Sequence, residues 1–346
     1  MTSRAKIKIR RSLWLKEENL KLNFDLYTRN YYIAKFIQAI GASSLKVLDV
    51  GGRGGLLKNF LNSTTDLTVL DLMKNDFSEK NYIVGNILDS KIPDRSFDVV
   101  TSSDLLEHIN EKDRPRALKE MFRISKDLVI IAAPFYSDNT ERTERAANEF
   151  YKRLYDEDHP WLKEHFESVL PKKENLENFL GKNNYQYYSI GSNNLDLWEL
   201  MQYFIFFCSK FSPGREKYYD VIRFYNEDFH KLGDSLEPTY RSIYFISKNN
   251  SLNRYKKIEA KTRLDISVLL QLIKLIMVTM NDAIVDYQKN ITKRLDYNED
   301  QVRKLTEENN QLTSELSAIY QSRSWKLASR LRSLKKKVDL FKRAGG

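Results

Sequence analysis

Residues 46–55 read Lys-Val-Leu-Asp-Val-Gly-Gly-Arg-Gly-Gly, and this stretch decides the fold. Its first half is an apolar run typical of a buried strand, and its second half is a glycine-rich turn before a helical segment at 56–61. Glycine lets the backbone approach a ligand closely, and a helix N-terminus offers free N–H groups. A second predicted strand ends in Asp71, 20 positions after Gly51 (71 − 51 = 20). At that spacing a carboxylate can accept both ribose hydroxyls of a bound nucleoside.

Short apolar runs alternate with helical patterns from about residue 45 to residue 247. Helices are predicted at 24–40, 111–125 and 195–207. Strands that alternate with helices indicate βαβ units and a mostly parallel, doubly wound α/β sheet. The predicted strands are 46–50, 67–72, 82–84, 97–101, 128–133, 185–190 and 241–247.

The chain of 346 residues is longer than one average domain, and its pattern changes along its length. We expect an N-terminal helical segment at 1–43 and an α/β domain at 44–250, with a helical insertion or lid at 134–184. A helical linker and coiled coil are expected at 251–321, before a basic amphipathic tail at 322–346.

Charge and composition exclude several classes of protein. The net charge is +10 (57 − 47), but residues 322–346 hold nine basic side chains against one acidic one, so the remainder carries only +2. A nearly neutral body argues against nucleic-acid binding. A single cysteine excludes an internal disulfide, and the N-terminus lacks the apolar core of a signal peptide. No uninterrupted apolar run reaches about 18–20 residues, so we expect a cytoplasmic chain.

The chain resembles class I S-adenosylmethionine-dependent methyltransferases, in their broad small-molecule branch. The resemblance rests on the ordered motifs VLDVGGRGG, VLDL, GNILDSKIPDRSFD, FDVVTSSDLLEHI and RALKEMFRISKDLVIIAAP between residues 46 and 134. It implies a Rossmann-like, seven-stranded sheet whose last strand is antiparallel. It also implies that S-adenosylmethionine binds at the carboxyl ends of the first strands.

The resemblance assigns cofactor roles to matching positions. Gly51, Gly52 and Gly55 would let the loop pass beneath the methionyl part, while Asp49 would help to hold its ammonium group. The ribose and adenine would contact four residues, and one more would lie near the methionine moiety: Asp71, Leu72, Asn86, Ile87 and Ser103. The sequence departs from the common pattern in two places, with Arg53 in the glycine turn and Asn86 where an acid is frequent.

Methyl transfer to an alcohol benefits from a positioned base. Four residues are candidates: His108 in LLEHI, His159 and His165 in the predicted lid, and Asp104. For His108 a packing role stays equally open, and each lid histidine could instead cap a helix or lie on the surface. No two of the four histidines have the spacing of a metal-binding helix, so we expect no obligatory catalytic metal.

Two further segments suggest the acceptor. DEDHPWLKEHFESVLP at 156–171 and IYQSRSWKLASRLR at 319–332 resemble segments of methyltransferases and glycosyltransferases that modify surface glycans. They favour O-methylation of a sugar hydroxyl in a cell-surface or exported glycan, with a lipid-linked acceptor. Two alternatives stay open: a methyltransferase acting on a small metabolite or lipid quinone, and a non-catalytic scaffold of a glycan-assembly complex with a vestigial methyltransferase fold.

The C-terminal region predicts association. From residue 291 to 319, apolar residues and two asparagines recur at alternating steps of four and three, which is the seam of a coiled coil. Asn309 at an a position favours a parallel dimer, and Asn298 at d leaves a trimer open; a helix folded back on its own domain is the alternative. In the tail, apolar residues from Trp325 to Phe341 share one helix face opposite the cations. Such a helix suits an anionic membrane surface, or a membrane-bound glycan-assembly enzyme as partner.

Overall fold

The computed structural model describes residues 16–42, 44–52, 54–73, 81–212, 216–255, 257–258 and 264–344. Arg53, the departure in the glycine turn, lies outside this part of the chain. Two compact units divide the molecule, Met1–Ala283 and Ile284–Gly346.

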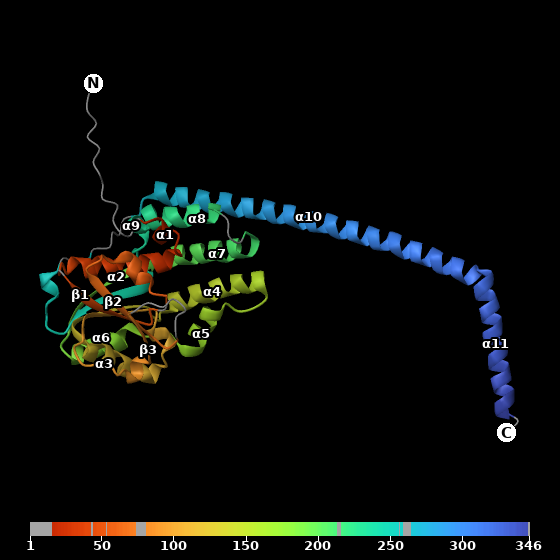
Figure 1. Cartoon of the computed structure of the whole chain (residues 1–346). Helices are drawn as coiled ribbons and strands as arrows, with labels where there is room; N and C mark the ends of the chain where they lie inside the picture. Colours follow the sequence, from red (N-terminus) through yellow and green to blue (C-terminus); the bar gives the residue numbers. More distant parts are fainter. Residues whose placement is uncertain are drawn as a thin grey trace. The chain divides into compact units, whose positions relative to one another are not determined.

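The first unit (Figure 1) contains a seven-stranded sheet. Its strand order is β3-β2-β1-β4-β5-β7-β6. Neighbours from β3 to β5 pair in parallel, and β7 pairs antiparallel with both β5 and β6. All seven predicted strands are confirmed, as is the antiparallel last strand. Their bounds are β1 Leu45–Val50, β2 Thr65–Asp71, β3 Tyr82–Val84, β4 Phe97–Ser103, β5 Ser125–Pro134, β6 Gln186–Asn194 and β7 Thr239–Ser247.

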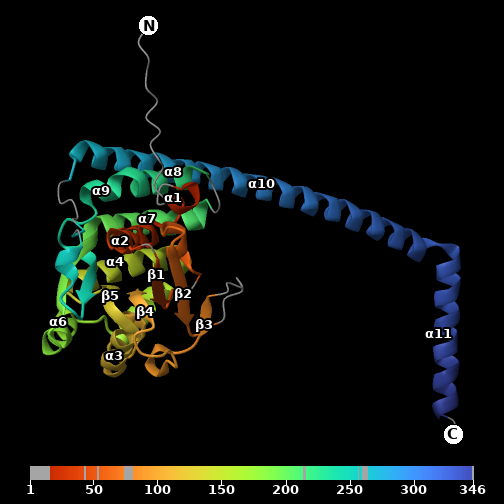
Figure 2. The ribbon, with the colours of Figure 1, turned by 60° about the vertical axis from the view of Figure 1, so that its left-hand side comes forward.

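Helices cover both faces of the sheet (Figure 2). α2 (Phe24–Ala39), predicted at 24–40, packs on one face, where its buried side chains meet Val47, Val99 and Phe245. α3 (Arg114–Ile124) and α6 (Lys173–Lys182) cover the other face. In α3 the buried residues 117, 118, 121 and 122 repeat with the helical period, which explains why this segment is a helix with one apolar side.

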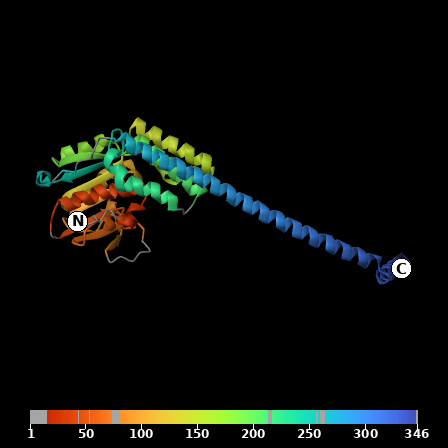
Figure 3. The same cartoon turned by 90° about the horizontal axis from the view of Figure 1, so that it is seen from above.

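A third cluster of apolar side chains joins helices beyond the carboxyl ends of the strands. α4 (Asp138–Tyr155) and α5 (Pro160–Ser168) pack with α7 (Leu195–Phe211), α8 (Glu216–Phe224) and the first turns of α10 (Figure 3). Ser137 caps α4 by accepting a hydrogen bond from the Thr140 backbone N–H at 3.0 Å. Shorter helices are α1 Glu17–Leu20, η2 Leu56–Phe60, η3 Ile87–Asp89, η4 Leu106–His108, η5 Glu111–Asp113, η6 Tyr225–Phe229, α9 His230–Gly233 and η7 Leu252–Arg254.

Two helices form the C-terminal region, α10 (Ile266–Gln321) and α11 (Arg323–Ala344). Although it has no uninterrupted apolar run of that length, α10 contains an 18-residue window with a mean hydropathy of 1.8, which is long and apolar enough to cross a membrane by length and composition only. Leu272, Ile276 and Ala283 of α10 are buried in the first unit, and core helices of soluble proteins can pass the same test. In α11 the side chains are described only as far as Ser333.

Candidate active site

The glycine turn follows the carboxyl end of β1 and packs against the buried carboxyl group of Asp49. Gly51 has φ +76°, a left-handed conformation that favours glycine, and its N–H donates to the Leu70 carbonyl at 2.8 Å. Gly52 has no space for a side chain, because a Cβ there would lie 2.1 Å from the Asp49 Oδ2 atom. The turn therefore holds its backbone directly against the Asp49 carboxyl group.

Asp49 is almost fully buried, and burial raises its pKa from 3.8 to about 7. The guanidinium group of Arg29 opposes this rise, and the Asp71 carboxylate adds to it. Asp49, Gly51, Gly52 and Ser103 line a small cavity of about 50 Å³ together with Arg29. A cationic group of a ligand would be stabilised next to this carboxylate.

A second cavity of about 230 Å³ continues from Gly51 along the ends of β2 and β3. Asp71 lies at its edge and accepts a hydrogen bond from the Met73 backbone N–H at 3.1 Å through Oδ1. Leu72 is 67% exposed, so an apolar side chain is available for a planar ring. Asn86, which caps η3, and Ile87 line the same cavity. The structure thus brings the predicted ribose and adenine residues together.

A third cavity of about 380 Å³ lies beside the first two. It shares Arg29 with the cavity at Asp49 and His108 with the cavity at Asp71. Trp161, Trp198 and Tyr240 contribute aromatic surface to it. All four predicted bases line it as well: Asp104, His108, His159 and His165.

Asp104 is engaged in ion pairs. Both of its carboxylate oxygens accept hydrogen bonds from Arg241, at 2.7 and 2.6 Å, and Arg29 pairs with Oδ2. Its φ of +50° is unusual for a residue other than glycine, and these contacts hold it there. The charge of the Asp104 carboxylate is therefore compensated by two guanidinium groups.

The three histidines have different surroundings. Burial lowers the pKa of His159 to about 4, and its ring packs against Tyr151 and Phe206. Burial also lowers the pKa of His108, whose Nδ1 lies 2.9 Å from Glu164 Oε2. For His165 burial alone would lower the pKa, but the hydrogen bond between its Nδ1 and Glu144 Oε1, at 2.8 Å, raises it overall.

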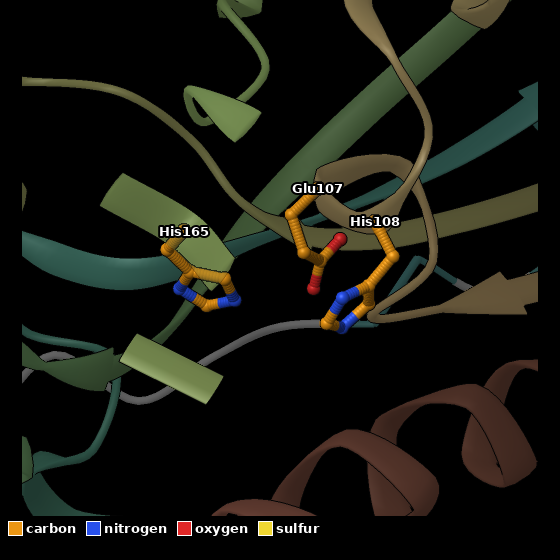
Figure 4. A group of neighbouring side chains, drawn as sticks. All are labelled: Glu107, His108 and His165. Carbon is orange, nitrogen blue, oxygen red and sulfur yellow. The ribbon is translucent and has the colours of Figure 1, made fainter. Parts of the chain in front are cut away.

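Glu107 was missed by sequence reasoning. Its side chain is 1% exposed, and its Oε2 atom has no hydrogen-bond partner among the described residues. Figure 4 shows its carboxylate between the rings of His108 and His165, with ligand atoms of the three residues within 4.8 Å of one another. Glu144 and Glu164 were also missed. Glu144 pairs with His165 and Glu164 with His108, and no spacing in the sequence relates the members of these pairs.

A family model described as a methyltransferase domain matches residues 48–132, which run from β1 to β5. The chain therefore contains the domain of an S-adenosylmethionine-dependent methyltransferase. The strand order and antiparallel β7 are those of the class I fold that the sequence resemblance implied. S-adenosylmethionine is its cofactor, and the residues present fit it. The loop at Gly52 leaves no room for a side chain, and the buried Asp49 carboxylate suits the cofactor's ammonium group.

Solved structures with a similar fold include YcgJ from Bacillus subtilis, at 13% identity and TM-score 0.38, covering 64% of this chain and 97% of that one. A SAM-dependent methyltransferase from Archaeoglobus fulgidus shows 15% identity and TM-score 0.41, covering 67% and 97%. Magnesium protoporphyrin IX methyltransferase from Synechocystis, with bound SAH, shows 10% identity and TM-score 0.41, covering 68% and 91%. Among curated proteins none matches the chain.

Proposed function

We propose that this methyltransferase transfers a methyl group to a sugar hydroxyl of a cell-surface or exported glycan, with a lipid-linked acceptor. The observation that carries the proposal is the 380 Å³ cavity, which adjoins both parts of the cofactor cleft. Its walls combine aromatic rings with several charged side chains. Rings that stack and polar groups that hydrogen-bond hydroxyls together suit a carbohydrate.

The segment that resembles glycan-modifying enzymes forms a wall of this cavity. Residues 156–171 contain α5, and this helix contributes Trp161, Glu164 and His165 to the cavity lining. Trp161 is 63% exposed, so it offers a flat apolar surface at the rim to a sugar ring. The resemblance and the geometry therefore concern the same residues.

Bound S-adenosylmethionine would supply a methyl group activated by a sulfonium. Asp49 and Asp71 would hold its ammonium and ribose groups, with Leu72, Asn86 and Ile87 around the adenine. The acceptor hydroxyl must lose a proton, and the cavity offers His108 and His165 for it. The Nδ1 atom of each ring is held by a carboxylate, which leaves Nε2 to accept a proton.

Tritiated S-adenosylmethionine, incubated with the full chain and membrane glycan extracts, tests the proposal. We expect label in the sugar fraction after acid hydrolysis, and none with Asp71→Ala as the inactive control. Label in a small lipid, or in a soluble metabolite alone, would exclude a glycan acceptor. No label together with no cofactor binding would favour a scaffold.

We also propose that the chain self-associates through α10. In the single chain the seam residues Leu305, Leu312 and Ile319 are 63%, 53% and 53% exposed, which leaves an apolar stripe without cover. A parallel dimer is favoured because Asn309 occupies an a position, with a trimer as the alternative. The basic tail would bring the enzyme from the cytoplasm to an anionic membrane surface, where its acceptor or a membrane-bound assembly enzyme lies.

A further inference from the structure

Glu107 is an unusual side chain for the wall of a cavity. Its side chain is only 1% exposed, so the carboxyl group is buried in the wall of the cavity. The Oε2 atom accepts no hydrogen bond from any described residue, although a buried polar atom without a partner is costly. A ligand that binds Oε2 would remove this cost.

The two histidines beside Glu107 each have a carboxylate partner, as metal-binding histidines usually do. Each directs Nδ1 to a carboxylate, His165 to Glu144 at 2.8 Å and His108 to Glu164 at 2.9 Å. Metal-binding histidines usually donate their second ring N–H to a carboxylate or carbonyl in this way, which fixes the tautomer and leaves the other nitrogen for the ion. The ring centroids of His108 and His165 are 5.7 Å apart, with the Glu107 carboxylate between them (Figure 4).

Charge around the cluster also favours a cation. Five carboxylates surround it or pair with its members: Asp25, Asp104, Glu107, Glu144 and Glu164. Two guanidinium groups, Arg29 and Arg241, oppose them. The surroundings of the cluster therefore hold more carboxyl groups than guanidinium groups, which suits a cation.

We propose that Glu107, His108 and His165 bind one divalent transition-metal ion through a carboxylate oxygen and two imidazole nitrogens. Two histidines and one carboxylate suit ions such as Zn²⁺, Co²⁺ or Mn²⁺, and they leave coordination positions open. Ligand atoms about 2.1 Å from an ion lie about 3–3.5 Å apart, against at most 4.8 Å here. Closure needs a movement of about 1 Å, which His108 permits because its side chain is 37% exposed.

Binding of the ion does not depend on the proposed function. Its role in methyl transfer does, because that role requires a hydroxyl acceptor in this cavity. In the acceptor cavity, the open positions would coordinate oxygen atoms of the acceptor, orient one hydroxyl and lower its pKa. His108 and His165 would then both be ligands and not proton acceptors, and the proton of the coordinated hydroxyl would pass to solvent water. The sequence expectation of no metal was based on spacing along one helix, whereas these ligands come from η4 and α5.

Metal binding is measured on the untagged full chain, after dialysis against EDTA, by titration with Co²⁺ and Zn²⁺ in a calorimeter. We expect one ion per chain and a Co²⁺ absorption spectrum of four or five coordination. Glu107→Gln and His165→Asn should each weaken binding at least tenfold, and Glu164→Gln about tenfold through loss of the contact that orients His108. His159→Asn is the matched control, since His159 lines the same cavity outside the cluster, and it should bind as the wild type does.

Cofactor affinity, measured for every variant, shows that the fold is intact. The proposal is overturned if neither ion binds at millimolar concentration, or if His159→Asn weakens binding as much as Glu107→Gln does. Because no acceptor is used, metal binding with the expected variant pattern supports the site even where the glycan labelling fails. Methylation that proceeds equally in EDTA would overturn only the role of the ion in the reaction.

Discussion

Replacement of Asp49 with asparagine should show how much of the pH dependence of cofactor binding comes from Asp49 and how much from the amino group of the cofactor. Burial raises the pKa of Asp49 from 3.8 to about 7, yet the ammonium group of the cofactor requires the ionised form. At pH 5 only about 1% of the free protein carries that form, so the wild-type Kd should be about a hundredfold higher at pH 5 than at pH 8. Asp49→Asn should bind weakly at pH 8 and show no such change.

The ionisation of Asp49 favours cofactor binding but lowers the free energy of unfolding of the free protein. Between pH 4 and 7 the folded protein binds one more proton at Asp49 than the unfolded chain does, so the contribution of this residue to stability falls as the pH rises. A difference of about three pKa units corresponds to about 4 kcal/mol as an upper value. Asp49→Asn should therefore raise the free energy of unfolding at pH 8 while it weakens cofactor binding.

Calorimetric titration with S-adenosylmethionine from pH 5 to 8, beside urea unfolding of the free protein at both ends of the range, measures the two effects. The amino group of the cofactor titrates near pH 8 in both proteins, so it cancels in the comparison. A wild-type Kd that changes less than tenfold over this range, or a variant with the same slope as the wild type, would refute the reasoning.

Three further substitutions test other parts of the structure. Asp71→Ala should raise the Kd for S-adenosylmethionine about 10- to 100-fold, with an unchanged melting temperature, whereas Asp66→Ala on the same strand should not; equal effects would exclude the ribose contact. Gly52→Ala places a Cβ 2.1 Å from the Asp49 carboxyl group, so it should displace this group and weaken cofactor binding in calorimetry. The control Gly181→Ala in α6 meets no atom within 4 Å and should raise the free energy of unfolding in urea by up to about 1 kcal/mol. Unchanged cofactor binding by Gly52→Ala would contradict the close contact. Leu305→Lys with Leu312→Lys should convert the full chain to a monomer in sedimentation, whereas Ser314→Lys, outside the seam, should not; an oligomer that survives both would exclude this seam.

The sheet was predictable because its strands carry local signals. A continuous apolar run such as 128–133 marks a strand buried on both faces. The glycine turn directly follows β1, and Asp71 is the last residue of β2. These residues lie where parallel strands end at one edge, so their proximity follows from the topology. The residues that line the predicted cofactor cleft could therefore be predicted from the sequence.

The acceptor cavity was only partly predictable. His108, His159 and His165 were candidates because histidines are few, but the sequence gives no reason for Glu107 to lie between two of their rings. The pairs His108–Glu164 and His165–Glu144 each join two different elements, and their formation depends on how α4 and α5 pack. Asp104 was a candidate base by position, and only tertiary contacts with Arg29 and Arg241 show that its charge is engaged.

The cofactor cleft and the proposed acceptor cavity share Arg29 and His108, but they draw on different helices. No residue of α4 or α5 lines the two cavities beside the glycine turn, whereas α5 supplies a wall of the acceptor cavity. Glu107 and His108 directly follow β4, so the sheet fixes their position relative to the cofactor cleft. His165 is positioned by the packing of α5 and by its hydrogen bond with Glu144 of α4. If the proposed function holds, a substitution in α5 away from Glu164 should alter acceptor recognition more than cofactor binding, because α5 lines only the proposed acceptor cavity.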